Sequence, residues 1–337
     1  MSKDLVPCPR RADSRLDAPP EECADRPRKV FPYMDIRLPQ YSVYRNTRNS
    51  QTGPMKIILI GAGRIGSAVA FCLANAGHDL TVVARGARFD ALSRDGAIVT
   101  VDGQRMPVKV ESALDPATPY DLAIVTVPEH LVAPLLPVLS VSCARTILLM
   151  FNTFQGTEPY RSVVGAERFV FGFPNMSAYL IDQRLRFRVD GPGMVTTLSN
   201  PVVAKLFKEA GIPSEVEDDM DAFLRSHVAL VVPLFLAALL TWQRATQLTW
   251  SEAKRLDVAW TEGFDVVRSL GHAPKPRLLA TLLHMPSFAR TGVLWLLSRS
   301  RLVKDLGDFG PMETRALIDE MAAAAPGKTP HLLALRP

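Results

Sequence analysis

Cysteine is scarce in this chain, and the motifs built on it are missing. Four cysteines occur among 337 residues, without close pairing or metal-site spacing: Cys8, Cys23, Cys72 and Cys143. This pattern suits a reducing compartment rather than a disulfide scaffold, so we predict a cytoplasmic protein. The sequence also contains no HExxH motif, no Cys/His cluster and no Ser/His/Asp arrangement. We therefore predict no bound metal.

A long uninterrupted hydrophobic run is missing as well. The longest run, Val228 to Leu240, has thirteen residues and contains Pro233. A membrane-spanning helix needs about 20 apolar residues, so we interpret this run as a buried core helix and predict no membrane association. A large excess of one charge is also absent. Residues 1–54 supply +3 of the net charge of +5, which leaves no case for a nucleic-acid partner.

Residues 1–54 differ in composition from the rest of the chain. They hold eight of the 27 prolines, ten Lys or Arg and seven Asp or Glu, without sustained periodicity. Such a segment cannot bury enough apolar surface to offset chain entropy, so we predict disorder. A natural start at Met55 is a second interpretation. A transit peptide is a third, against which the seven acids argue, and the apolar segment of a secretory signal is missing.

The chain does contain a glycine turn between a strand and a helix. Residues Met55 to Arg85 read MKIILIGAGRIGSAVAFCLANAGHDLTVVAR. The apolar run Ile57 to Ile60 predicts a strand, the alanine-rich stretch a helix, and Leu80 to Ala84 a second strand. The turn between the first strand and the helix is predicted to bind the cofactor through Gly61, Ala62, Gly63, Arg64, Ile65 and Gly66.

This turn has the GxGxxG spacing that binds the pyrophosphate of a dinucleotide. Gly61 permits the tight turn, and Gly63 lets the backbone approach the phosphates. Gly66 lets the helix pack closely on the strand. The helix N-terminus then offers free N–H groups to the anion. The competing interpretation is an ordinary structural turn in an unrelated α/β domain.

The residues after the second strand bear on the choice between NAD and NADP. NAD-binding units usually place an acidic residue there, whereas this chain has Arg85 and Arg88 before the first acid, Asp90. Arginine suits a 2′-phosphate because its planar guanidinium binds phosphate in a bidentate manner. We therefore predict NADP as the cofactor and Arg85 as a ligand of it. The alternative is that both arginines are solvated loop charges.

The pattern after Met55 predicts an α/β fold with two domains. Strands and helices alternate up to about residue 217, the signature of a parallel sheet. Beyond Asp218 the pattern predicts helices only. We therefore expect a Rossmann-type dinucleotide-binding domain over 55–217 and an all-helical substrate or dimerisation domain over 218–337. The predicted helices in the second part are 219–243, 251–270, 275–283 and 313–324.

Several local features resemble the ketopantoate reductases (2-dehydropantoate 2-reductases). These are the opening MKIILIGAGRIG, the turn Ala76 to Asp79, Arg85, and the pair Phe151 and Asn152 after a strand. In the second half, DAFLRSHVA from Asp221 and METRALI from Met312 resemble two helices of the family. The resemblance implies NADPH-dependent reduction of a 2-oxo acid to the 2-hydroxy acid, and a place in pantothenate biosynthesis.

The resemblance also implies three catalytic positions, one of which departs from the family. Typical members use a lysine as proton donor where this chain has His227. Because a histidine titrates near neutral pH without perturbation, this exchange need not abolish catalysis. Asn152 matches the family asparagine that would contact the nicotinamide or the substrate, and Glu313 matches the late glutamate. The competing interpretations are a core histidine, a turn asparagine and an exposed acid at a helix start.

Two further departures affect the cofactor and the substrate. A lysine that the family commonly carries after its fourth strand is Pro128 here, which weakens the case for NADP. Ser287 to Asp308 offers no convincing match for the residues that hold the pantoyl group. We therefore keep two alternatives: a dehydrogenase of an imine or a larger hydroxy acid, and a non-catalytic NADP-binding sensor. The expected partner is a small 2-oxo acid, and a homodimer is possible.

Overall fold

A computed structural model of the chain describes residues 53–191, 193–244, 246–276, 281, 283–299 and 310–337. These residues belong to one compact unit. Residues 1–54, predicted to be disordered or to precede a natural start at Met55, lie outside the described residues except for Gly53 and Pro54. Most of the predicted helix 275–283 also lies outside them.

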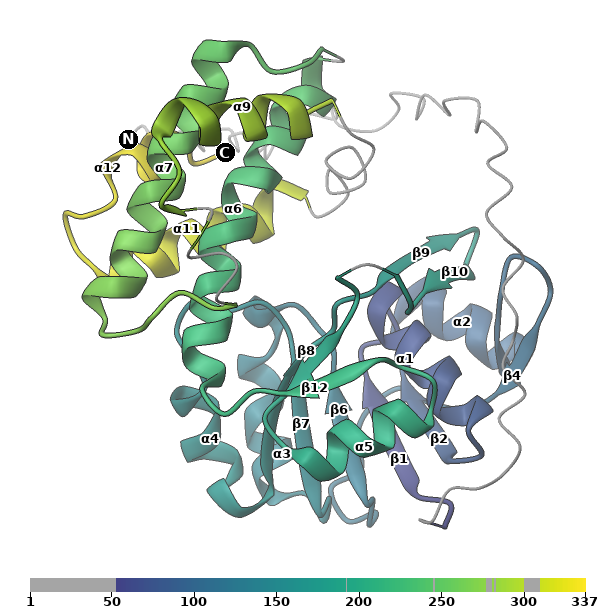
Figure 1. The fold of residues 1–337 in the computed structure, drawn as a ribbon. Coiled ribbons are helices and arrows are strands. Elements are labelled where there is room, and N and C mark those ends of the chain that lie inside the picture. Colours follow the sequence, from purple (N-terminus) through teal and green to yellow (C-terminus); the bar gives the residue numbers. More distant parts are fainter. Residues whose placement is uncertain (1–52, 192, 245, 277–280, 282, 300–309) are drawn as a thin grey trace, which may run out of the picture. The chain divides into compact units, whose positions relative to one another are not determined.

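An eight-stranded sheet in the order β12-β11-β8-β7-β6-β1-β2-β5 organises the first half of the chain (Figure 1). The strands are β1 (Lys56–Ile60), β2 (Asp79–Val83), β5 (Lys109–Glu111), β6 (Leu122–Val125), β7 (Thr146–Met150), β8 (Phe169–Phe173), β11 (Thr196–Leu198) and β12 (Ser214–Val216). Neighbouring strands pair in parallel, except that β11 runs antiparallel to β8. The predicted parallel sheet is confirmed apart from this one pair. The chain returns from β8 through a hairpin rather than a crossover helix, so β11 enters in the opposite direction.

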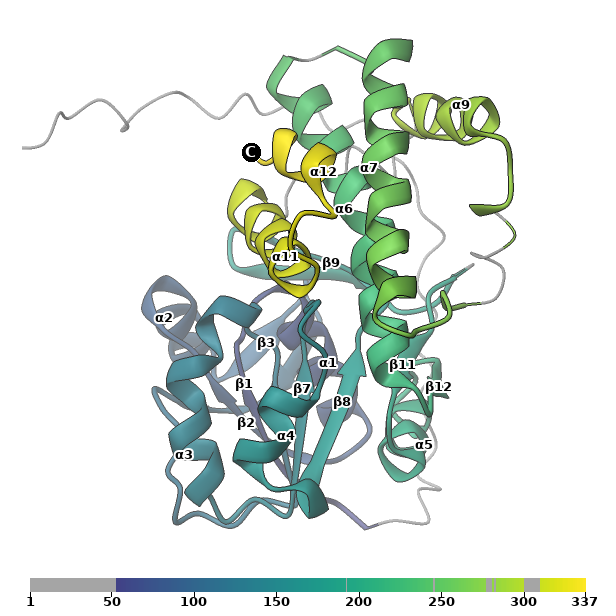
Figure 2. The same cartoon turned by 90° about the vertical axis from the view of Figure 1, so that its left-hand side faces the viewer.

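Helices cover both faces of this sheet. Alternate residues of β1 point to opposite faces: Ile57 and Leu59 join the core under α1 (Arg64–Asn75) and α5 (Pro201–Glu209), while Ile58 and Ile60 join the other core. That second core is covered by α3 (Leu136–Val141) and α4 (Glu158–Val164), which lie side by side (Figure 2). The predicted Rossmann-type arrangement is confirmed.

Two small hairpins and helix α2 (Gly86–Asp95) complete this half. The first hairpin consists of β3 (Ala97–Val99) and β4 (Arg105–Pro107), and the strand that follows it, β5, joins the main sheet. The hairpin of β9 (Ser177–Ile181) and β10 (Arg184–Arg188) was not predicted. Its signal in the sequence is the alternation RLRFR, in which Phe187 packs on Phe71 of α1 with ring centroids 5.3 Å apart.

The second half of the described chain is helical, as predicted. It contains α6 (Met220–Arg244), α7 (Trp250–Ser269), α9 (Ser287–Leu297), α11 (Gly310–Ala324) and α12 (Pro330–Ala334). The sheet ends with β12 at Val216 and α6 begins at Met220, so the change falls near the predicted boundary. Helices α9 and α12 were not predicted because the first lies in the divergent segment and the second has only five residues.

Helix α6 is the core helix predicted from the apolar run Val228 to Leu240. By length and composition alone, Met220–Thr241 would be long and apolar enough to cross a membrane, with a mean hydropathy of 2.0. Inside this molecule 67% of that window is buried. Val228 and Val232 are fully buried among side chains of α7 and α11, such as Trp260 and Ile318. Burial in the helical core therefore accounts for the apolar sequence.

Candidate functional site

The glycine turn has the close packing that its sequence predicted. Gly61 has φ +107°, and a Cβ on Gly66 would lie 2.0 Å from the Gly61 carbonyl oxygen. Only glycine fits at these two positions. Above Gly63, by contrast, no atom lies within 4 Å of where a Cβ would stand. Gly63 is the N-cap of α1 and no side chain caps the helix there, so the first N–H groups of α1 are available to an anion.

Three side chains that sequence reasoning did not assign hold this turn in place. Thr126, at the end of β6, donates from its hydroxyl to the Gly61 carbonyl at 2.8 Å. Buried Ser67 donates to the Ala62 carbonyl at 3.0 Å, and Arg88 Nε donates to the same oxygen at 3.1 Å. The turn is therefore rigid before any ligand arrives. Its features fit a dinucleotide pyrophosphate: an open approach at Gly63 and a free helix N-terminus.

The two arginines after β2 have different surroundings. Arg85 is the exposed N-cap residue of α2, and no described residue makes an ion pair or hydrogen bond with its side chain. Arg88 is not a solvated loop charge, because Nη2 donates to Ser67 at 3.0 Å and Nη1 to the Gln183 carbonyl at 2.6 Å. Burial lowers the pKa of Arg88, while the charge of Asp95 opposes the shift. Of the two guanidinium groups, only that of Arg88 is therefore bonded to the glycine turn within the described residues.

Asn152 and Glu313 contact each other although 161 residues separate them. Asn152, just beyond β7, donates from Nδ2 to Glu313 Oε1 at 2.8 Å, and Glu313 stands in the first turn of α11. Burial raises the pKa of Glu313, whereas the Asn152 hydrogen bond and the charges of Arg64 and His130 act against this rise. Glu313 therefore lies within electrostatic range of Arg64 in the glycine turn. The structure brings together one predicted residue from each half of the chain.

The Asn152 amide also has one atom without a partner. Its Oδ1 is buried, and no described atom donates a hydrogen bond to it. A buried carbonyl oxygen without a donor is uncommon in native proteins. Oδ1 can only accept, so a group that satisfies it must carry an N–H or an O–H.

His227 of α6 stands in an aromatic setting. Its ring centroid is 3.9 Å from that of Phe173, at the end of β8, and it stacks on Phe223 at 6.2 Å. Because β7 pairs with β8 through Met150 and Gly172, Asn152 and Phe173 follow neighbouring strand ends. No hydrogen bond or ion pair to His227 occurs among the described residues. Burial lowers its pKa to about 4, which corrects the premise that this histidine titrates near neutral pH.

Glu320, two turns after Glu313 on α11, was missed by sequence reasoning. Its carboxylate accepts the Phe154 backbone N–H at 2.5 Å and the Thr153 hydroxyl at 3.3 Å. Burial raises the pKa of Glu320 to about 7, and the Phe154 N–H opposes that rise. A sequence signal existed in the spacing of seven between Glu313 and Glu320, which places both on one face of a helix.

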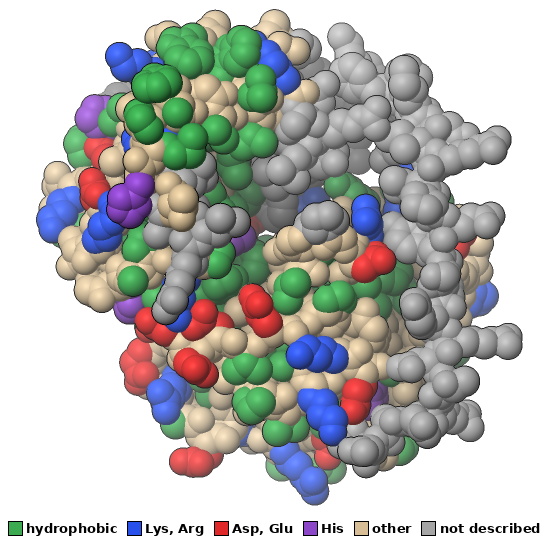
Figure 3. Space-filling view, in the orientation of Figure 1, with side chains coloured by type: hydrophobic (Ala, Val, Ile, Leu, Met, Phe, Trp, Pro, Cys, Tyr) green, Lys and Arg blue, Asp and Glu red, His purple; other side chains and the backbone are tan. Residues whose placement is uncertain are grey.

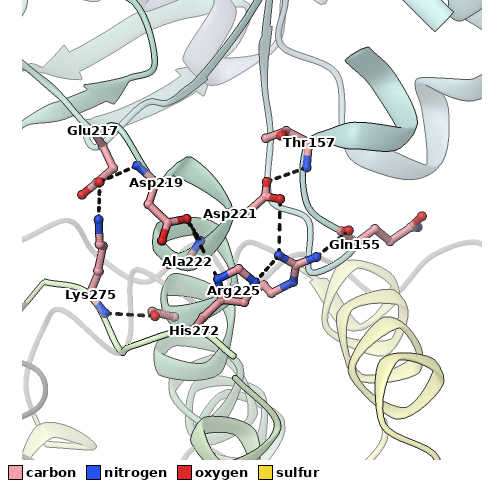
Figure 4. A network of polar contacts seen from close by, with 10 residues as sticks. Gln155, Thr157, Glu217, Asp219, Asp221, Ala222, Arg225, His272 and Lys275 are labelled. Carbon is pink, nitrogen blue, oxygen red and sulfur yellow. Dashed lines mark hydrogen bonds and ion pairs between the residues drawn. The ribbon is translucent and has the colours of Figure 1, made fainter. Parts of the chain in front are cut away.

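Arg225 of α6 makes polar contacts with three other parts of the described chain. Figure 4 shows its guanidinium between the Gln155 carbonyl at 2.9 Å, His272 Nε2 at 2.9 Å and Asp221 at 3.5 Å. Asp221 also accepts the Thr157 backbone N–H at 2.8 Å. These bonds tie the start of α6 to the loop that follows Asn152. No group of three or more His, Cys, Asp or Glu that could hold a metal occurs in the described part of the chain.

Comparison with known proteins agrees with this geometry. The family model of ketopantoate reductase PanE/ApbA matches residues 57–197. The 2-dehydropantoate 2-reductase of Pyrococcus horikoshii is 37% identical over 73 residues, which is 21% of this chain and 24% of that protein. The chain thus aligns with only about a quarter of the length of this curated relative.

Solved structures extend the likeness of the fold to both halves. A PanE/ApbA family ketopantoate reductase from Ralstonia eutropha JMP134 superposes with a TM-score of 0.65 at 19% identity, over 84% of this chain and 96% of that one. D-mandelate dehydrogenase, solved with NADH and anilino(oxo)acetate, superposes with a TM-score of 0.62 at 13% identity, over 84% and 96%. The part of the chain that matches the ketopantoate reductase family model, residues 57–197, carries the glycine turn, Arg85 and Asn152.

Proposed function

We propose that the protein reduces a small 2-oxo acid to the 2-hydroxy acid with NADPH. The observation that carries the proposal is the contact between Asn152 and Glu313, within electrostatic range of Arg64 in the glycine turn. A dinucleotide held by Gly61, Ala62, Gly63, Arg64, Ile65 and Gly66 would extend along the carboxyl ends of the strands, where ligands of such sheets bind. Asn152 lies at that edge, directly after β7.

The cofactor supplies the hydride when bound, and Arg85 supports NADPH over NADH. Arg85 is exposed at the end of β2, beside the turn that would hold the adenosine half. Its guanidinium has the geometry for a phosphate monoester. The acidic residue that usually bonds the ribose 2′-hydroxyl of NAD is missing at this position.

Asn152 is proposed to orient the reacting groups. Its buried Oδ1 needs a donor, which the carboxamide N–H of a nicotinamide provides and a keto oxygen does not. Its Nδ2 is held by Glu313, which fixes the orientation of the amide. The side chain therefore favours one placement of the nicotinamide ring at the end of β7.

His227 and Glu313 are proposed to share the acid chemistry. With a pKa of about 4, His227 is neutral at pH 7, so it acts as an N–H donor that polarises the keto oxygen rather than as an imidazolium. Glu313 has a raised pKa and is the carboxyl that can hold and deliver the proton. In this division of roles the histidine replaces the family lysine without having to carry a charge.

Turnover with purified protein tests the proposal. NADPH should be oxidised in the presence of 2-oxo acids, and His227→Ala should lower kcat by about 10²–10⁴-fold if the ring contacts the reacting oxygen. Exposed His331, which pairs with Glu262, gives the control His331→Ala with unchanged turnover. No turnover across a broad panel of 2-oxo acids with either NADPH or NADH would reject the reductase.

A dehydrogenase of a larger hydroxy acid is the second candidate. The likeness in fold to D-mandelate dehydrogenase supports it. Turnover of larger aromatic 2-oxo acids in the same panel distinguishes this dehydrogenase from a reductase of small 2-oxo acids. Turnover of imines tests the alternative of an imine-specific dehydrogenase. Tight NADPH binding without any turnover would instead support the sensor. A cytoplasmic location and a homodimer stay predictions.

A further inference from the structure

The loop after β7 is fixed by two carboxylates from one helix. Glu313 accepts from the side chain of Asn152, and Glu320 accepts from the backbone N–H of Phe154 and the hydroxyl of Thr153. The two glutamates stand seven residues apart, two turns of α11, and so face the same side. Glu313 belongs to the proposed site, whereas neither the family likeness nor the proposed mechanism gives Glu320 a role.

The loop needs this fixation because it crosses from one core into another. Phe151 belongs to the core on one face of the sheet, while fully buried Phe154 belongs to the core of the helical half. Asn152 stands between them. Any rotation of the backbone between these anchors would move the Asn152 amide. Thr153 adds a local bond, since its hydroxyl accepts the Gln155 N–H at 3.2 Å.

A carboxylate at this place has a specific use. A charged acceptor forms a shorter and stronger bond to a backbone N–H than a neutral one, and it can accept from a second donor at the same time. The contact is retained although burial disfavours the charge. Two titratable groups face Glu320 from neighbouring elements: Glu129 of the short helix η1 (Glu129–Leu131) and Tyr160 of α4. Tyr160 donates to Glu129 at 2.9 Å and lies 3.4 Å from the Thr153 hydroxyl.

We propose that Glu320 is a positioning residue for the reaction. Its carboxylate fixes the backbone at Thr153 and Phe154 and thereby holds the Asn152 amide in register with Glu313 and the nicotinamide. This inference rests on the proposed function, because it assigns Glu320 a task in that site. Glu320 touches neither substrate nor cofactor in this scheme and acts through Asn152.

The test compares Glu320→Gln with a matched control on the same helix. Asp319→Asn changes the adjacent residue, which is exposed and pairs with Arg336 away from the loop. In Glu320→Gln we expect faster hydrogen exchange at the Phe154 amide and a shifted side-chain amide resonance for Asn152. We expect kcat to fall roughly 10-fold to 100-fold, the scale for a misplaced reacting group, with little change in KM. Asp319→Asn should match the wild type in all three.

A double-mutant cycle separates positioning from general destabilisation. If Glu320 acts through Asn152, adding Glu320→Gln to Asn152→Ala should cost no further activity. Additive losses in kcat, or an unchanged Phe154 exchange rate, would overturn the proposal. Should the wild type lack turnover, the proposed reductase fails. The exchange rate and the Asn152 resonance still decide whether Glu320 holds the amide, because both are measured without substrate.

Discussion

At the scale of single residues, the most informative groups are two half-buried side chains, Glu320 and His227, whose pKa values are shifted in opposite directions. The pKa of Glu320 rises from 4.5 to about 7, and that of His227 falls from 6.5 to about 4. Both shifts arise mainly from burial. Burial penalises the charged form, which is the deprotonated form of an acid and the protonated form of a histidine.

These shifts predict opposite effects on the dependence of stability on pH. Between pH 4.5 and about 7 the folded state binds the extra proton on Glu320, so the free energy of unfolding falls as pH rises. Between about pH 4 and 6.5 the unfolded state binds the extra proton on His227, so the free energy of unfolding rises with pH. Each contribution is on the order of 3 kcal/mol, and in the wild type the two slopes largely cancel between pH 4.5 and 6.5.

Single variants should expose each contribution. Glu320→Gln should leave a stability that increases from pH 4.5 to 6.5, and His227→Gln one that decreases over the same range. Denaturant unfolding at several pH values measures both slopes. If the free energy of unfolding depended on pH with the same slope in both variants, the opposite pKa shifts of Glu320 and His227 would be contradicted.

At the scale of elements, substitutions in the glycine turn should affect stability and cofactor binding differently. Gly63→Ala adds a Cβ into open space at an N-cap with φ −69°, so the free energy of unfolding should change by less than about 1 kcal/mol. The Kd for NADPH should nevertheless rise by roughly tenfold or more, because the methyl group occupies the path of the phosphates. Gly66→Ala should impair both, since its Cβ would stand 2.0 Å from the Gly61 carbonyl. Titration with NADPH measures the Kd of both variants, and thermal unfolding measures their stability. A Kd for Gly63→Ala equal to that of the wild type would count against phosphate binding at the turn.

The packing of α9 on α7 depends on a buried ion pair. Asp257 is 1% exposed and accepts from Arg290 Nε at 2.8 Å and from the Ser287 hydroxyl at 2.6 Å. Asp257→Ala should lower the free energy of unfolding by about 3–5 kcal/mol, because it leaves a buried guanidinium unpaired. The exposed pair Asp265 and Arg268 is the control, and Asp265→Ala should cost less than about 1 kcal/mol. Similar losses in both variants would show that the burial of Asp257 is not what matters.

At the scale of the whole molecule, the candidate site exists only where distant parts of the chain meet. The sheet and the glycine turn could be predicted, because each depends on a short run such as Ile57 to Ile60 followed by GxGxxG. The antiparallel direction of β11, the hairpin of β9 and β10, and helix α9 could not, because their packing is decided by neighbours far along the chain. The same holds for the partners of Arg88 and Arg225, whose bonds reach across 95 and 70 residues.

The surface of the helical half exposes several large apolar side chains. Figure 3 shows hydrophobic side chains gathered where α9 and the start of α7 lie in Figure 1. In these two helices Phe288 is 71% exposed, Leu296 63% and Trp250 49%. Exposed apolar surface of this kind is common at protein–protein contacts. The predicted homodimer stays a prediction, which sedimentation of the full chain addresses.

The sequence by itself determined the glycine turn with its flanking strands and helix, and the change from an α/β part to a helical part. These follow from local periodicity and from glycines at positions where the backbone geometry accepts no other residue. Tertiary structure alone decided which side chains work together. It joined Asn152 to Glu313, bonded Arg88 to the turn, placed His227 against Phe173, and brought Glu320 to the loop beside Asn152. The physical reason is that burial and hydrogen bonding, which set ionisation and orientation, depend on neighbours in space rather than in sequence.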